Sequence, residues 1–336
     1  MEETVSRPKA LNIRTAIITL CVGGLVAGLG TWSYLGSRDG KDVCGELSRH
    51  ERIRAALGSA HRSDMSCAEL GSAIRQATIG NGSGNGDHSL AQAQAMKDVL
   101  VAVDDIAGEP GETIEDELAE PVSTALGGYS VDLYEILSPG GLEYTRHAIP
   151  SEKAWEDDTG VHMSVSVPAL LRVMTALSAD PDAYADLRTA VARQAAEQFP
   201  ATPRDKTEKS LSPYPTVTSW VIGSMNAVAE AARERHADEN TAQWDAGAFA
   251  GLSKASGNRP AFEDDPAGYI TSSWRGTLPS STPDDLLGLL QAQSIEMTQS
   301  WSEALDTNEQ VQRSLLRDAR NATASARRST LKELSS

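Results

Sequence analysis

Residues 155–162, WEDDTGVH, hold the side chains of this sequence best suited to chemistry. Asp157, Asp158 and His162 could transfer protons, and Trp155 stands at the start of the same run. A pair of carboxylates would also serve a glycoside hydrolase, but acidic residues are too numerous for the sequence to select a pair. The alternative, which the sequence favours, is that these residues form a solvated loop. We therefore name no catalytic residue and predict only that the four side chains could form a polar cluster.

Other catalytic and cofactor patterns are absent from the sequence. No cysteine follows Cys67, which excludes a cysteine nucleophile from the main body. Phosphate-loop and dinucleotide glycine patterns do not occur, nor does the HExxH pattern of zinc proteases. The six histidines lack metal-like spacing. We expect no cofactor and no metal, and the sequence leans away from an enzyme.

Residues 15–37 form an uncharged, largely apolar run. At about 1.5 Å per residue, a helix of this length crosses a hydrocarbon core of about 30 Å. Trp32 and Tyr34 fall at its outer end, where aromatic rings favour the headgroup layer. A buried core helix, a cleaved signal and a lipoprotein signal at Cys21 are alternatives, but the run is long for a signal and Leu20 does not fit a lipobox. The run predicts a transmembrane anchor in contact with membrane lipid.

The flanks of the run predict its orientation. With only residues 1–14 before the span, a cytoplasmic tail and an extracytoplasmic body form the simpler topology. Cys44 and Cys67 then form an even pair in an oxidising compartment, and a disulfide closing this loop would contribute about 3 kcal/mol. Two unpaired buried thiols are the alternative. Zinc is disfavoured because His50 and His61 lie between the cysteines without ligand-like spacing.

The charge of the chain excludes one class of partner. The formal net charge is −17, which argues against nucleic acid and against anionic lipid headgroups as a general partner of the body. Acidic residues gather at 98–158, a stretch that could dock a basic partner, although a solvated face is the favoured reading. Near the end of the chain, Arg313, Arg317 and Arg320 form a possible interaction surface that could bind this acidic stretch in the same or another copy. The alternative is a soluble helix end, which cations stabilise.

Apolar residues recur at helical spacing along most of the chain, and strand patterns are almost absent. Ser66 with Glu69, and Ser89 with Gln92, have the spacing of capping boxes. The fold class is therefore all-α, an N-terminal transmembrane helix followed by an irregular multi-helix extracytoplasmic domain. The expected organisation is a cytoplasmic tail (1–14), an anchor (15–37), a short Cys-linked helical segment (38–79), a Gly-rich linker (80–88), a main helical domain (89–256), an irregular loop (257–282) and a long C-terminal helix (283–336).

Three stretches resemble a known group of proteins: LAEPVSTALGGYSVDLYEIL, VPALLRVMTALSADPDAYADLRTAVARQAAEQF and SWVIGSMNAVAEAARERHADENTAQWDAGAF. They look like the helical regions of uncharacterised actinobacterial envelope proteins, some described as TPR-repeat-region or WXG-type secretion-associated. The likeness covers residues 90–255 and rests on helix rhythm. It implies an interaction role at the cell envelope and supplies no active site.

These observations leave two classes of function. The first is a single-pass membrane protein whose extracytoplasmic helical body is a scaffold or binding module at a Gram-positive envelope, with an unknown protein partner or self-association. The second is a cell-wall hydrolase that uses carboxylates.

Overall fold

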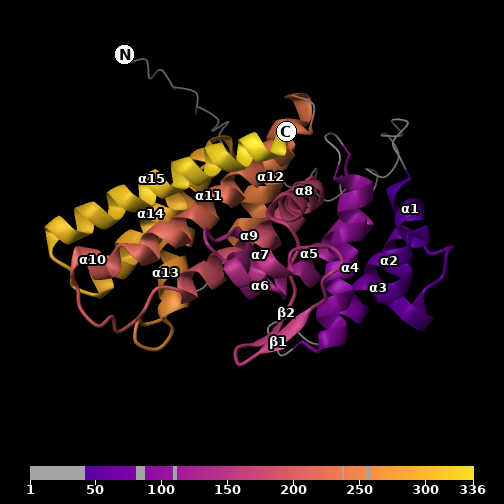
Figure 1. The fold of residues 1–336 in the computed structure, drawn as a ribbon. Coiled ribbons are helices and arrows are strands. Elements are labelled where there is room, and N and C mark those ends of the chain that lie inside the picture. Colours follow the sequence, from indigo (N-terminus) through magenta and orange to yellow (C-terminus); the bar gives the residue numbers. More distant parts are fainter. Residues whose placement is uncertain (1–41, 81–87, 109–111, 237, 255–257) are drawn as a thin grey trace, which may run out of the picture. The chain divides into compact units, whose positions relative to one another are not determined.

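The computed structural model describes residues 42–80, 88–108, 112–236, 238–254 and 258–336, and Asp42–Ser336 forms one unit (Figure 1). The predicted anchor at 15–37 and nearly all of the predicted linker at 80–88 lie outside the described residues. None of the described helices is both long enough and apolar enough to span a membrane.

Helices dominate the described residues, which confirms the all-α class. The helices are α1 (Val43–Arg49), α2 (Glu51–Leu57), α3 (Cys67–Ile79), α4 (Leu90–Ala107), α5 (Asp116–Gly127), α6 (Ser130–Leu137), α7 (Leu142–His147), α8 (Val167–Leu177), α9 (Pro181–Glu197), α10 (Glu208–Leu211), α11 (Pro213–Glu234), α12 (Asp238–Lys254), α13 (Pro266–Arg275), α14 (Leu286–Ala304) and α15 (Glu309–Leu334). A hairpin of β1 (Trp155–Asp157) and β2 (Gly160–His162) lies between α7 and α8 along the chain. Three short 3-10 turns complete the elements: η1 (Gly58–Ala60), η2 (Leu278–Ser280) and η3 (Pro283–Asp285).

Local sequence signals set the start of several helices. Ser66 and Glu69 form a capping box at α3, and Ser89 and Gln92 form another at α4, both as predicted. Asp180 caps α9 with its side chain, directly before a proline in the first turn. These caps satisfy backbone N–H groups that a helix start otherwise leaves without partners.

The predicted irregular loop at 257–282 is wrong where α13 forms. Asp265 caps this helix and also binds Arg193 of α9 through both carboxylate oxygens, at 2.8 and 3.0 Å. Trp274 is 2% exposed, and its indole N–H donates to Leu289 O at 2.8 Å. Because α13 is short and rich in Gly, Ser and Thr, its helical conformation depends on these tertiary contacts rather than on local propensity.

The predicted single C-terminal helix at 283–336 is also wrong, because α14 and α15 are separate helices that pack on each other. Helix α14 ends at Ala304, and Asp306 turns the chain with a positive φ of 53°. Asn308 then caps α15 by accepting from its first turn. The helical periodicity resumes after this break, but Thr307 and Gln310 have the spacing of a helix start and predict a possible restart at this point, one residue from the observed N-cap.

Small residues allow α15 to lie directly against α11, and Figure 1 shows the two helices side by side. A Cβ atom added to Gly223 of α11 would lie 2.5 Å from the backbone oxygen of Thr323 and 2.9 Å from Cβ of Ala326. Glycine is therefore required at this crossing. The chain has three Phe, and alanine and glycine at such crossings compensate by bringing backbones close together.

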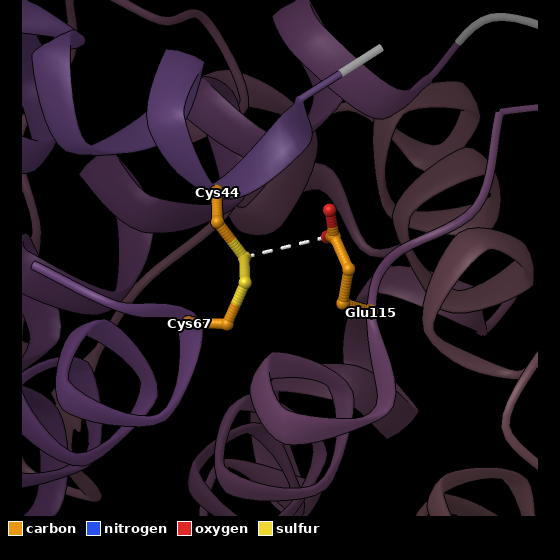
Figure 2. A group of neighbouring side chains, drawn as sticks. All are labelled: Cys44, Cys67 and Glu115. Carbon is orange, nitrogen blue, oxygen red and sulfur yellow. Dashed lines mark hydrogen bonds between the residues drawn. A yellow bond between two sulfur atoms is a disulfide. The ribbon is translucent and has the colours of Figure 1, made fainter. Parts of the chain in front are cut away.

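The Cys44–Cys67 disulfide forms as predicted and joins α1 to the start of α3 (Figure 2). Glu115 Oε2 lies 3.3 Å from Cys44 Sγ. A disulfide sulfur carries no proton, so a hydrogen bond here requires the carboxyl to donate, and burial raises the pKa of Glu115 in that direction. The segment at 38–79 is not set apart from the rest, because α2 packs on α4 and α3 packs on α5.

A fully buried arginine lies where α9, α11 and α14 meet. Arg188 is 0% exposed and has no carboxylate among its hydrogen-bond partners. Its guanidinium donates to Gln293 Oε1 at 2.9 Å, Tyr184 OH and Asn226 Oδ1 at 2.8 Å, and Leu290 O at 2.9 Å. Burial lowers the pKa of Arg188, since the charge is removed from water.

Replacing Arg188 with methionine should lower the free energy of unfolding by about 3–5 kcal/mol, because the buried acceptors of three helices lose their donor together. The measurement is chemical denaturation of the purified chain followed by circular dichroism. The matched control is Arg320→Met, at an exposed position of α15, which should change stability by no more than about 0.5 kcal/mol. Equal stability of the two variants would contradict a central role for Arg188.

Candidate functional site

The hairpin of β1 and β2 brings part of the predicted polar cluster together. Trp155 and His162 are directly opposite in the antiparallel ladder. In the turn between the strands, the backbone N–H and the hydroxyl of Thr159 donate to Asp157 Oδ1 at 2.8 and 2.6 Å. Gly160 follows with φ of 140°, a conformation that favours glycine. The turn therefore holds the Asp157 carboxylate next to the His162 ring, with Nε2 3.3 Å from Oδ1.

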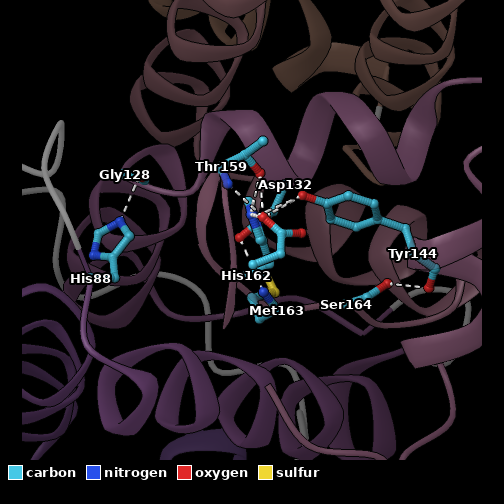
Figure 3. A network of polar contacts seen from close by, with 9 residues as sticks. His88, Gly128, Asp132, Tyr144, Thr159, His162, Met163 and Ser164 are labelled. Atoms are coloured by element: carbon cyan, nitrogen blue, oxygen red, sulfur yellow. Dashed lines mark hydrogen bonds and ion pairs between the residues drawn. The ribbon is translucent and has the colours of Figure 1, made fainter. Parts of the chain in front are cut away.

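His162 is the centre of a hydrogen-bond network that joins the hairpin to α6 and α7 (Figure 3). Its Nδ1 lies 3.0 Å from Asp132 Oδ1 and 3.0 Å from Tyr144 OH, and its Nε2 lies 2.9 Å from Thr159 Oγ1. The Tyr144 hydroxyl donates to Asp132 Oδ1 at 2.7 Å. His162 and Asp132 are 6% and 3% exposed, so the network is largely shielded from water.

The electrostatics of the network favour a charged imidazolium. The hydrogen bond with Asp132 raises the pKa of His162 despite the opposing effect of burial. The Thr159 hydroxyl and backbone N–H lower the pKa of Asp157 to about 2. Burial raises the pKa of Tyr144, whose phenol therefore stays a proton donor. When His162 is protonated, it is a cation held between the carboxylates of Asp132 and Asp157.

The network does not prepare Thr159 as a nucleophile. A catalytic hydroxyl donates its proton to the histidine, whereas the Thr159 hydroxyl donates to Asp157 Oδ1. A charged His162 has no lone pair free to accept a proton. The chemistry of this group is therefore that of an ionic clamp on the hairpin.

The structure places Trp155 and Asp157 beside His162, and the favoured reading of a solvated loop is wrong at His162, which is 6% exposed in β2. Trp155 stacks on His147 with ring centroids 4.2 Å apart and meets Tyr144 edge-on. Asp158 is exposed and makes no hydrogen bond or ion pair within the described part of the chain. Sequence reasoning missed Asp132 and Tyr144, which come from separate helices and carry no local signal. Thr159 could have been found, because an Asp followed two residues later by Thr and then Gly is typical of a turn.

A pocket of about 680 Å³ lies beside this network. Its walls are the turn between α5 and α6, the tip and second strand of the hairpin, and one face of α9. Five polar side chains that line it make no hydrogen bond or ion pair among the described residues: Thr124, Ser130, Asp186, Thr189 and Gln194. Gln194 is 8% exposed as a residue, and its amide, which has no hydrogen-bond partner among the described residues, remains accessible from the pocket.

The charged residues of the pocket differ in whether they have ion-pair partners. Arg193 binds Asp265 through two hydrogen bonds and Glu197 at 3.2 Å, so its guanidinium is already neutralised. Asp186 has no such partner. Partial burial, followed by the charge of Asp182, raises the pKa of Asp186. Among the five side chains of the pocket without a partner in the described chain, Asp186 is therefore the single carboxyl.

An apolar groove lies on the other side of Tyr144. Its volume is also about 680 Å³, and its lining includes Tyr144, Ile149, Val167 and Trp220. Ile149 and Val167 are 56% and 42% exposed. Tyr144 lines this groove while its hydroxyl contacts Asp132, which lines the polar pocket.

A buried lysine holds the rim of the groove. Lys97 of α4 is 0% exposed, and its ammonium donates to His147 O at 2.6 Å and Ile149 O at 3.0 Å. Burial lowers the pKa of Lys97. These bonds cap the carbonyl end of α7 and fix the loop that leads into the hairpin.

Within the described residues, one group of side chains could place three metal-ligating atoms together, namely Cys44, Cys67 and Glu115. The disulfide uses both sulfurs, so this group is not available as a thiolate site.

The three arginines of the predicted interaction surface lie along α15. Arg313 pairs with Glu309 one turn away, and Arg317 lies 3.8 Å from Glu208 of α10. Arg320 is exposed and has no polar contact among the described residues. No ion pair of the described chain joins these arginines to residues 98–158. Their role as an interaction surface stays a prediction.

Comparison with known proteins gives no relatives: no protein-family model matches the chain, and neither a curated protein nor a solved structure shows significant similarity to it.

The hairpin should be held more firmly at acid than at alkaline pH. The groups that face His162 are Asp132, Asp157, Tyr144 and, at longer range, Glu135. Because the folded pKa of His162 is raised above the unfolded value of about 6.5, its stabilisation is fully present below pH 6.5 and is lost as pH rises through the folded pKa. Hydrogen exchange of the hairpin amides, corrected for intrinsic rates, should show stronger protection at pH 5.5 than at pH 8.5.

The substitution His162→Gln should remove this pH dependence in the hairpin, since glutamine has no charge to lose. The matched control is His61→Gln, at a histidine that contacts Ser48 O in another part of the fold. It should leave the hairpin response intact. Persistence of the response in the His162 variant would show that another group produces it.

Proposed function

We propose that the chain is a single-pass membrane protein whose helical body acts outside the cytoplasm as a binding module, or scaffold, at a Gram-positive cell envelope. Its ligand site is the polar pocket between α5, α6, α9 and the hairpin. The observation that carries this proposal is Gln194, which is 8% exposed, lines the pocket and has no hydrogen-bond partner for its amide among the described residues. A ligand in the pocket can supply the hydrogen bonds that this amide does not make within the protein.

Three features support the location. Residues 15–37 have the length and composition of a membrane anchor. Cys44, the first cysteine of the disulfide with Cys67, lies a few residues after that run. Because disulfides persist mainly in oxidising compartments, this bond favours a body outside the cytoplasm. The resemblance of three helical stretches to actinobacterial envelope proteins points in the same direction.

The alternative is a carboxylate-dependent cell-wall hydrolase, and the observation that favours it is the raised pKa of Asp186 in the pocket. Such an enzyme needs a protonated acid and a second, ionised carboxylate. Glu197 lines the same pocket, but it already pairs with Arg193. We therefore rank binding above hydrolysis.

The topology has a direct test. A phosphatase reporter that is active only outside the cytoplasm, fused after Ser336, should be active in cells, and the chain should fractionate with membranes. A reporter active only in the cytoplasm should be silent at the same position, which makes the two fusions a matched pair. The reverse pattern would refute the extracytoplasmic body.

A test for hydrolysis of cell-wall glycans distinguishes a binding module from a hydrolase. We expect the purified chain to release no reducing ends from Gram-positive cell walls. If it does release them and Asp186→Asn lowers the rate by about a hundredfold or more, as loss of a general acid would, the hydrolase is correct. Asp264→Asn, an exposed aspartate of the loop before α13, is the control for loss of one charge.

A further inference from the structure

The free polar groups of the pocket define the chemistry of what fits there. Thr124, Ser130 and Thr189 offer hydroxyls that donate and accept, and Gln194 offers an amide that does both. Asp186 adds a carboxyl group. A complementary ligand must itself supply several donors and several acceptors at short spacing.

The same groups exclude two common ligand classes. A phosphate or carboxylate ligand would face the Asp186 carboxyl. The cationic side chains that line the pocket are already engaged, Arg193 by Asp265 and Glu197, and His162 by Asp132 and Asp157. An apolar ligand would cover Gln194 without satisfying its amide, which costs free energy.

The pocket also has apolar surface beside its polar groups. Val131 is 47% exposed, and the His88 ring, which stacks on Tyr129 with centroids 4.0 Å apart, also lines the pocket. The hydrogen bond from His88 to Gly128 O holds that ring in place (Figure 3). A pyranose ring combines hydroxyls around its edge with C–H groups on its faces, so it matches both kinds of surface.

We propose that this pocket binds a neutral saccharide through Gln194, Thr189 and Asp186. The proposal rests on the proposed function, because it names the ligand class of the same site. Size agrees with it, since a pocket of about 680 Å³ is within the usual range for small-molecule sites. The adjacent residues Arg188 and Thr189 lie on different sides of α9, so the helix that carries the buried guanidinium also presents the pocket wall.

The deciding variant is Gln194→Met, which keeps the length of the side chain and removes its amide. Because the amide has no partner in the free protein, this change should leave the melting temperature equal or raise it. The matched control is Gln312→Met on α15, the same chemical change away from the pocket. If Gln194 served folding alone, Gln194→Met would lower the melting temperature. Measuring both melting temperature and ligand affinity therefore separates a structural role from a role in binding.

The experiment is isothermal titration calorimetry of the full chain in a polyoxyethylene detergent, since maltoside detergents are themselves saccharides. The probes are cellobiose, maltose and chitobiose, with inorganic phosphate and tri-alanine as the other classes. We expect at least one disaccharide to bind, with affinity about tenfold weaker in Gln194→Met and unchanged in Gln312→Met.

Each other result has a defined meaning. If tri-alanine or phosphate binds in a Gln194-dependent manner and no disaccharide does, the saccharide assignment is wrong while the binding module stands. Disaccharide binding that is equal in Gln194→Met places the ligand elsewhere and overturns the proposal. If none of the five probes binds, both the saccharide and the pocket as a ligand site are rejected.

Discussion

An arginine charge with no carboxylate beside it determines how the central helices meet. Burying a guanidinium is costly unless its N–H groups are satisfied, and Arg188 directs them to oxygen atoms of α9, α11 and α14. The Trp274 ring of α13 lies 5.8 Å from the same guanidinium, close enough for a cation–π contact. Each acceptor belongs to one turn of one helix. If these helices shifted along one another, few of the other positions would place acceptors at the guanidinium N–H groups. The geometry of α9, and with it the wall of the polar pocket, follows from this constraint.

Away from Arg188, the helices are held by close packing, by polar contacts and by the disulfide. Helices α11 and α15 approach so closely at Gly223 that dispersion forces between backbones and small side chains supply the attraction there. The first three helices depend on the Cys44–Cys67 bond and on packing against α4 and α5. A charged centre thus specifies the arrangement. Close packing, polar contacts such as that of Arg327 with Glu230, and the disulfide stabilise its edges.

Sequence patterns predict the parts of this fold whose causes are local. The capping boxes at Ser66 and Ser89 need only four consecutive residues, and the disulfide could be inferred from two cysteines beyond an apolar run. Helix α13 escapes such reasoning because its N-cap, Asp265, is fixed by an arginine far away in the sequence. The site was predicted only where the chain is contiguous, at Asp157 and His162. Asp132 reaches the network from α6, 30 residues from His162, and no periodicity encodes that meeting.

The Tyr144 side chain has one surface in the apolar groove and its hydroxyl on Asp132 and His162 at the edge of the polar pocket. The two recesses are therefore separated by a partition made of Tyr144 and the two side chains that its hydroxyl contacts. A displacement of the hairpin that lengthens the bond from Tyr144 to Asp132 changes the shape of both recesses at once. A ligand in one recess that binds more tightly to one position of this partition must therefore change the affinity of the other recess for its own ligand. By thermodynamic linkage, the second ligand changes the affinity for the first by the same factor.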